Sequence, residues 1–313
     1  MRLTANLAMI VALAMTPAVA SEYAYVTCQN GDGVSVLDLT SQKRHQHWHV
    51  SGEPAGIAVA KTAVFTVAAG SKVLRKHDPK TGLVQAQVTL DGGPVGVAHD
   101  PWRNRLFVSD WYNARVWVLD ASDLSQTGYL AVDAAPAGLA LSKDGRYMAT
   151  AQRDADQVSI FDAKTLELMH NVTVGTRPFG LRFGPNGRLF VGNVGSDDLS
   201  VIEPDLGLLL TTIDVGKRPY GVAFAQGRAF VSNQYSDTLS VIDLETLAHI
   251  ATLNTGEYPE GIDTNSDGTQ IIVANWFDNS VTIFDALSLS VIQEIETCDG
   301  PRAFGTFILG DKK

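Results

Sequence analysis

A proline recurs along this chain at nearly constant spacing, and this repeat constrains the fold more than any other feature. Successive prolines are 40 to 42 residues apart, and each of the first six begins a P-x-G triplet. An acidic residue stands sixteen positions before each proline and closes a β-like run such as VSVLD or VTIFD. The prolines are Pro54, Pro94, Pro136, Pro178, Pro219, Pro259 and Pro301, and the acidic residues are Asp38, Asp78, Asp120, Asp162, Glu203, Asp243 and Asp285. Seven copies of one unit predict a repeat architecture.

Each unit has the pattern of four short strands. An apolar run follows P-x-G, a turn such as KDG or SDG comes next, and then a second run such as RLFVSD or QIIVAN. A polar loop leads to the VSVxD run, which is followed by a fourth run such as LAHIATLNTG. Alternating apolar residues, β-branched residues and Gly/Asp/Asn turns indicate strands rather than helices. Four antiparallel strands per repeat are typical of propeller blades.

The two ends of the chain complement each other. The first β-like run, YAYVTC at 23–28, has the pattern of a second strand, and the last, AFGTFIL at 303–309, that of a first strand. Together they would complete a seventh blade and close the ring, which removes exposed sheet edges. A solenoid would instead need distinctive end caps. We therefore expect an all-β, seven-bladed β-propeller of four-stranded antiparallel blades, closed by pairing the N-terminal strands with the C-terminal strand in one blade.

The repeats resemble those of the YVTN-repeat β-propeller family. The resemblance rests on YVTC at 25–28, on FVGN (190–193), FVSN (230–233) and IVAN (272–275), and on the P-x-G and VSVID segments. Cys28 stands where the family has Asn. The resemblance covers residues 21–313 and implies the propeller fold. The propellers of this family also resemble those of quinoprotein amine dehydrogenase subunits and of lactonases.

Residues 1–20 differ from the repeats. Arg2 precedes an apolar run, and Ala18-Val19-Ala20 stands before Ser21. This layout predicts a secretory signal peptide, a propeller over 21–313 and a periplasmic or extracellular location. No later apolar run is long enough to span a membrane. The formal net charge of −10 argues against nonspecific nucleic-acid binding.

The repeated residues have structural interpretations. Proline fixes φ where the inner strand begins, and glycine permits close approach near the axis. The Asp that ends each VSVxD run can cap the next turn. Asn193, Asn233 and Asn275 recur at one register, which favours turn-forming residues over ligands of a channel metal.

Function is expected where the copies differ. The residues flanking the first three prolines are mostly small, whereas those of the last four are cationic and aromatic. The loops after the second strands should emerge at the same mouth, and they also carry large aromatic residues. The candidate ligand- or partner-binding residues are Arg177, Phe179, Arg218, Tyr220, Tyr258, Glu260, Arg302, Trp111, Tyr112, Arg153, Tyr235 and Trp276. Aromatic residues with arginines are typical of recognition surfaces, although such rings can also fill a channel mouth or cover a neighbouring blade.

The chain lacks the common catalytic motifs. It has no C-x-x-C-H, G-x-S-x-G, H-E-x-x-H or P-loop, so no cofactor and no catalytic residue are assigned. His45, His47 and His49 would share one face of an outer strand, which favours a solvated edge over a metal site. We expect a non-catalytic binding or scaffold module for a protein partner or an anionic or aromatic ligand. The alternative is a lactonase-like enzyme or a quinoprotein-associated accessory subunit.

The two cysteines are expected to form a disulfide. Cys28 ends the second strand of the closing blade, and Cys298 lies just before the first strand of that blade. In an antiparallel pair, the end of one strand faces the start of the other. Exported cysteines usually oxidise, although a reactive thiol pair or a soft-metal site remains an alternative.

Overall fold

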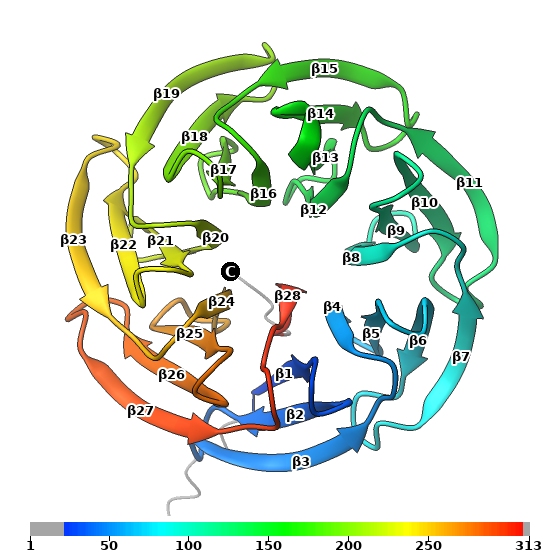
Figure 1. Cartoon of the computed structure of the whole chain (residues 1–313), viewed down its shortest axis with the longest axis horizontal. Helices are drawn as coiled ribbons and strands as arrows, with labels where there is room; N and C mark the ends of the chain where they lie inside the picture. Colours follow the sequence, from blue (N-terminus) through cyan, green and yellow to red (C-terminus); the bar gives the residue numbers. More distant parts are fainter. Residues whose placement is uncertain (1–21, 309–313) are drawn as a thin grey trace, which may run out of the picture.

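The computed structural model describes residues 22–308, and the predicted signal peptide lies outside these residues. Seven small sheets surround a central channel and form a closed ring (Figure 1). The seven-bladed propeller predicted from the repeats is confirmed. Within the described part of the chain, no helix is long and apolar enough to cross a membrane.

The first three blades follow the predicted order from the channel outward. Blade one has strands β4 (Pro54–Ala60), β5 (Ala63–Ala68), β6 (Val73–His77) and β7 (Val84–Thr89). Blade two has β8 (Pro94–Asp100), β9 (Arg105–Asp110), β10 (Arg115–Asp120) and β11 (Gln126–Ala131). Blade three has β12 (Pro136–Leu141), β13 (Tyr147–Gln152), the 3₁₀ turn η1 (Arg153–Ala155), β14 (Gln157–Asp162) and β15 (Leu168–Thr173).

The next three blades repeat this order. Blade four has β16 (Pro178–Phe183), β17 (Leu189–Asn193), β18 (Asp198–Glu203) and β19 (Leu208–Asp214). Blade five has β20 (Pro219–Ala225), β21 (Arg228–Asn233), β22 (Thr238–Asp243) and β23 (His249–Asn254). Blade six has β24 (Pro259–Thr264), β25 (Gln270–Asn275), β26 (Ser280–Asp285) and β27 (Val291–Glu296). All six inner strands begin at a repeat proline, as predicted.

Blade seven closes the ring with both ends of the chain. Strands β1 (Tyr23–Cys28), β2 (Gly33–Asp38) and β3 (Lys43–His49) form a three-stranded sheet. The C-terminal segment runs along β1, where Arg302 N donates to Thr27 O at 2.7 Å and Tyr25 N to Phe307 O at 2.8 Å. Its regular strand, β28 (Phe304–Thr306), pairs in parallel with β4 of blade one. The C-terminal segment therefore joins blade seven to blade one as well as completing blade seven.

Glycine is required where neighbouring inner strands approach the crowded axis. A Cβ on Gly180 would lie 1.8 Å from Tyr220 O, and one on Gly56 would lie 2.2 Å from Val95 O. Gly305 in β28 has a φ of 138°, and its Cβ would lie 2.0 Å from Ile57 O. These contacts explain the glycine of P-x-G and of PRAFG.

The repeated polar residues hold the turns of each blade. Asp243 Oδ1 accepts the backbone N–H groups of Glu245 at 3.1 Å and Thr246 at 2.7 Å. Comparable bonds form at Asp38, Asp78, Asp120, Asp162 and Asp285. Glu203 makes no such bond among the described residues, so the capping role predicted for all seven carboxylates holds for the six aspartates.

Asn193, Asn233 and Asn275 hold neighbouring strands rather than facing one another around the channel. Asn233 Nδ2 donates to Thr238 Oγ1 at 3.1 Å and to Ser240 Oγ at 3.0 Å. Asn193 and Asn275 donate to the hydroxyls at the equivalent positions on their own third strands, Ser200 and Thr282. The three amides thus have structural roles.

Candidate functional site

The predicted site residues surround one end of the channel, which we call the proline mouth because the repeat prolines lie there. Each loop after a second strand returns to the residue before a proline. Trp276 N donates to Tyr258 O at 3.0 Å, and Gln234 N donates to Arg218 O at 3.0 Å. Equivalent bonds join Trp111 to Gly93, Arg153 to Ala135 and Val194 to Arg177. The two groups of residues predicted to share a mouth therefore do so.

A backbone feature that the sequence analysis missed orients the residues at this mouth. Arg177, Arg218 and Tyr258 precede prolines and have φ values of 55°, 58° and 60°, in the left-handed region that costs energy for non-glycine residues. Their backbone N–H groups are bound by carboxylates of the preceding blade: Asp156 at 2.7 Å, Asp197 at 2.8 Å and Asp237 at 2.9 Å. The constant offset of 21 residues between carboxylate and partner could have revealed the feature.

An aromatic plug lies beneath the mouth and is made of Phe179, Tyr220 and Phe304. The centroid of the Phe179 ring lies 4.7 Å from that of Tyr220 and 5.0 Å from that of Phe304. All three side chains are buried, and Trp111 packs against Phe179 at 6.1 Å. Phe179 and Tyr220 thus fill the channel at its proline mouth, which is the alternative that the sequence left open. Phe304 was not predicted, although PRAFG departs from P-x-G at its position.

A buried ion pair adjoins the plug. Arg302 Nε lies 3.1 Å from Glu260 Oε2, and its guanidinium donates to Tyr220 Oη at 3.0 and 2.8 Å. Gln234 Nε2 donates to Glu260 Oε1 at 2.5 Å. Burial raises the pKa of Glu260, opposed by the charge of Arg302. Burial would lower the pKa of Arg302, but Glu260 and Tyr220 outweigh it and raise that pKa. Burial also raises the pKa of Tyr220.

Four aromatic side chains form a continuous cluster at the surface of the mouth, over blades five and six. We call Tyr235, Tyr258, Trp276 and Phe277 the aromatic row. Tyr258 lies at its centre, with ring centroids 5.5 Å from Tyr235, 5.7 Å from Trp276 and 4.7 Å from Phe277. Tyr235 and Phe277 are each 58% exposed. Burial raises the pKa of Tyr258 to about 12, so its hydroxyl is protonated at neutral pH.

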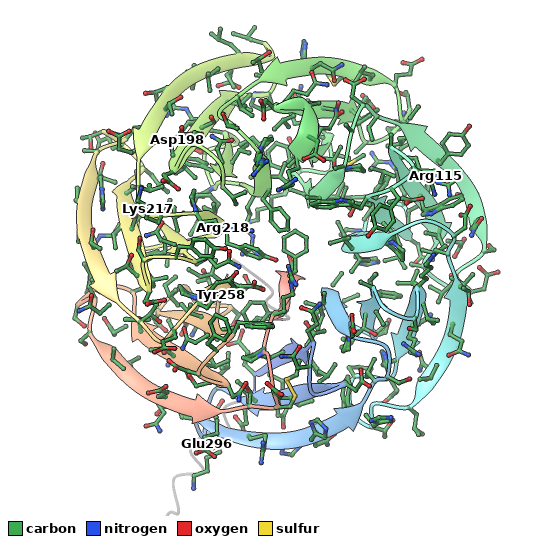
Figure 2. All side chains as sticks on the ribbon, viewed as in Figure 1. Arg115, Asp198, Lys217, Arg218, Tyr258 and Glu296 are labelled. Atoms are coloured by element: carbon green, nitrogen blue, oxygen red, sulfur yellow. A yellow bond between two sulfur atoms is a disulfide. The ribbon has the colours of Figure 1, made fainter. Side chains whose placement is uncertain are left out.

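Arg218 extends the aromatic row. Its guanidinium lies 4.6 Å from the centroid of the Tyr235 ring and donates to Tyr235 Oη at 2.7 Å. No carboxylate forms an ion pair with Arg218 within residues 22–308. Figure 2 shows Arg218 and Tyr258 together near the inner ends of their blades. The surface therefore combines cationic and aromatic groups.

The other predicted residues lie apart from the aromatic row. Arg153 stacks over Trp111, with 5.4 Å from its guanidinium carbon to the ring centroid. Tyr112 is 78% exposed. Arg177 is exposed, and its side chain has no hydrogen-bond or ion-pair partner in the described part of the chain. The structure thus separates the predicted set into a buried plug with its ion pair, the aromatic row with Arg218, and outlying residues.

The structure assigns no metal ligands. His45, His47 and His49 lie on β3, the outermost strand of blade seven. Among residues 22–308, no three His, Cys, Asp or Glu side chains are grouped so that they could hold a metal ion.

The cysteines form the predicted disulfide. Cys28 and Cys298 are bonded, with their Cα atoms 5.6 Å apart. The link ties the end of β1 to the segment that leads into the C-terminal strand, close to the proline mouth.

Known proteins resemble this chain mainly in fold. Residues 196–311 match the model of the YNCE-like beta-propeller family. A functionally unknown protein from Desulfotomaculum acetoxidans has a TM-score of 0.76 at 15% identity, over 92% of this chain and 98% of that chain. The dihydro-heme d1 dehydrogenase NirN in complex with DHE has a TM-score of 0.69 at 15% identity, over 92% and 76%. Hydrazine synthase from Kuenenia stuttgartiensis has a TM-score of 0.72 at 18% identity, over 84% and 91%. No curated protein matches the sequence.

Proposed function

We propose that this protein is an exported, non-catalytic binding module that docks a partner polypeptide on the aromatic row. The observation that carries this proposal is the cluster of four rings at the surface beside Arg218, a cation that forms no ion pair among the described residues, although its charge acts on the buried Glu260. Exposed aromatic residues next to arginine are typical of the energetically dominant residues of protein interfaces. The partner would present an acidic side chain or a terminal carboxylate to Arg218 and Arg177.

The plug of Phe179, Tyr220 and Phe304 fills the channel beneath this surface. A partner at the proline mouth would therefore contact the aromatic row from outside instead of entering the channel.

The disulfide and the predicted signal peptide support export, because disulfides persist in oxidising compartments. The alternative of an enzyme or redox-enzyme accessory subunit rests on the resemblance to lactonase and quinoprotein propellers and on the names of structural neighbours such as NirN and hydrazine synthase. At 15% and 18% identity, these neighbours bear on the fold alone.

Site-specific photocrosslinking in the native host tests the proposal. Benzoylphenylalanine replaces Phe277 in the aromatic row or, as a matched control, Tyr129 on the outer strand of blade two, which is 61% exposed. We expect one discrete protein adduct from position 277 and none from position 129. Arg177→Ala with Arg218→Ala should abolish that adduct while leaving the melting temperature nearly unchanged.

Two results would contradict the docking surface. One is the same adduct from positions 277 and 129, which would indicate nonspecific contact. The other is an adduct from position 277 that persists in the double arginine variant. A large loss of stability in that variant would instead assign the arginines a structural role.

A further inference from the structure

A large cavity occupies the channel on the far side of the plug. It has a volume of about 1110 Å³, and its lining extends from Tyr220 and Phe304 to the turns after the inner strands. These turns lie on the face opposite the proline mouth, and two of their lining residues, Lys61 and Lys143, are exposed. Organic ligands in proteins usually occupy cavities of about 300–1,000 Å³. The channel is therefore large enough for a small organic molecule.

The cavity has apolar walls. Lining side chains include Phe65, Val97, Leu181, Val222, Phe224 and Ile262. Trp102, in the turn after β8, also lines the cavity and is 62% exposed. An exposed indole beside an apolar cavity can cover the body of an organic ligand.

Cations predominate among the charged lining residues, although the whole chain is acidic. The charged lining residues are four cations, Lys61, Lys76, Lys143 and Arg182, and two carboxylates, Glu260 and Asp267. Glu260 is already paired with Arg302. Burial lowers the pKa of His99, which also lines the cavity, so its imidazole adds no positive charge near neutral pH. A cationic lining in a low-dielectric cleft attracts anions.

The side chains of two of these cations have no partner within the described residues. Arg182 is bound to Asp263 at 2.7 Å, and Lys76 donates to Ser122 O at 2.9 Å. Lys61 and Lys143, by contrast, have no hydrogen bond or ion pair to any residue in 22–308. They belong to the turns of blades one and three, so both lie at the rim of the same cavity.

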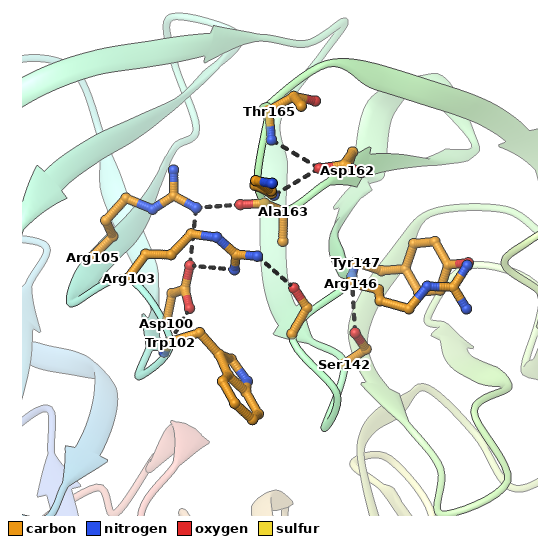
Figure 3. Close-up of polar contacts among 12 residues, drawn as sticks. Asp100, Trp102, Arg103, Arg105, Ser142, Arg146, Tyr147, Asp162, Ala163 and Thr165 are labelled. Carbon is orange, nitrogen blue, oxygen red and sulfur yellow. Dashed lines mark hydrogen bonds and ion pairs between the residues drawn. The ribbon is translucent and has the colours of Figure 1, made fainter.

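Two nearby arginines, Arg103 and Arg105, are held in hydrogen bonds and ion pairs within the protein (Figure 3). Asp100 is fully buried, and its Oδ2 accepts from Arg103 at 3.2 Å and from Arg105 at 3.0 Å. Arg103 also donates to Gly145 O at 3.1 Å, which joins the turns of blades two and three. The side chain of Trp102 extends away from this network. The indole and the two lysines, by contrast, take no part in this network and are available to a ligand at this rim.

We propose that this cavity binds an organic anion with an apolar body, whose carboxylate, phosphate or sulfonate lies between Lys61 and Lys143 and whose body lies along the channel wall. The site is on the face opposite the aromatic row. The cavity site can therefore be tested independently of the proposed docking function.

Titration of the full chain with 1-anilinonaphthalene-8-sulfonate, followed by its fluorescence, tests the site. We expect saturable binding of one dye per chain. Lys61→Ala with Lys143→Ala should weaken binding about tenfold, corresponding to about 1.4 kcal/mol for the loss of two charge contacts. The charge-matched control is Lys43→Ala with Lys80→Ala, two exposed lysines at the outer rim, and it should bind as the unchanged chain does.

A steric variant and a competition complete the test. Thr306 is exposed on β28 and lines the cavity, so Thr306→Trp should block the dye without changing the charge. Decanoate should displace the dye much better than decanol, which has the same body without the charge. Octyl phosphate in place of decanoate would show which anionic headgroup is preferred.

Three results would overturn the site. The first is the absence of saturable dye binding. The second is equally weakened binding in the control variant Lys43→Ala with Lys80→Ala. The third is unchanged binding in a folded Thr306→Trp variant. Equal displacement by decanol and decanoate would refute its anion preference. Loss of the crosslink at position 277 has no bearing on these results, because that position lies on the other face.

Discussion

Glu260 and Arg302 each follow a repeat proline, and in this protein they bind each other. Both were predicted to contact a ligand because they depart from the small residues found in the first three copies. In the structure their side chains form an ion pair, with hydrogen bonds from Gln234 and to Tyr220. A sequence comparison of copies identifies unusual residues, but it does not show that two of them from adjacent blades pair with each other.

We expect Glu260→Ala to lower the free energy of unfolding by about 2–3 kcal/mol, because it leaves Arg302 without its counter-charge. The loss stays below that of a fully buried pair, since the Arg302 side chain is 22% exposed and keeps its hydrogen bonds to Tyr220 and Gln29. Glu260→Ala combined with Arg302→Leu should recover part of that loss. Urea unfolding of both variants, with the exposed Arg177→Ala as control, measures the effect. A loss below about 1 kcal/mol for Glu260→Ala would show that the pair contributes no more than a surface salt bridge.

The elements of each blade were predictable because their signals are local and repeated. The proline, the glycine and the turn aspartate each act within one repeat, so seven copies reinforce the same interpretation. Contacts between repeats were harder to predict. The parallel pairing of β28 with β4 depends on the close approach at Gly305, and the plug depends on three rings from separate blades. The aromatic row was partly predicted, because Tyr258 precedes a repeat proline and Tyr235 and Trp276 lie in the loops after second strands, which were expected at the same mouth. Phe277, at the position equivalent to Tyr235, was not among the candidate residues.

The turn aspartates make stability depend on pH. The pKa values of four turn aspartates, Asp78, Asp162, Asp243 and Asp285, are lowered by hydrogen bonds from the turn backbone. The largest contribution comes from the backbone N–H of Thr81, Thr165, Thr246 and Ser288, respectively. A carboxyl group with a lowered folded pKa stabilises the fold above its unfolded pKa, and this contribution is lost as the pH falls through the folded pKa.

Melting temperatures measured against pH should therefore stay nearly level from about pH 7 to 5 and fall below about pH 4, near the ordinary aspartate pKa. Changing all four aspartates to asparagine, which keeps the amide oxygen as an acceptor, should make the acid limb shallower. Asp214→Asn with Glu296→Gln, at carboxylates without a turn hydrogen bond among the described residues, is the control. An equally steep limb in the fourfold variant would exclude the turns as its source.

At the scale of the whole molecule, the two faces of the ring differ. The proline mouth is closed by the plug and carries the aromatic row, whereas the opposite face carries the rim of a large cavity. The repeat produces both faces from the same strands. The two faces therefore differ through residues at strand ends, where side chains can vary without disturbing the blade cores.

Closure of the ring depends on blade seven, the blade built from both ends of the chain, and the disulfide there should contribute strongly to stability. Cys28 and Cys298 are 270 residues apart in sequence. Crosslinking so long a loop restricts the unfolded chain and should raise the free energy of unfolding by about 5 kcal/mol.

Removing the disulfide tests this contribution. Without the crosslink, the C-terminal segment is still held by backbone hydrogen bonds, by side-chain hydrogen bonds such as that from Ala303 N to Thr27 Oγ1, and by packing. We therefore expect Cys28→Ser with Cys298→Ser to unfold at a lower urea concentration, with β1, β2 and β28 losing amide protection before the other blades. A reductant should lower the midpoint of the unchanged chain in the same way and leave that of the double variant where it is. Equal midpoints for the oxidised and reduced unchanged chain would show that packing alone holds the ring closed.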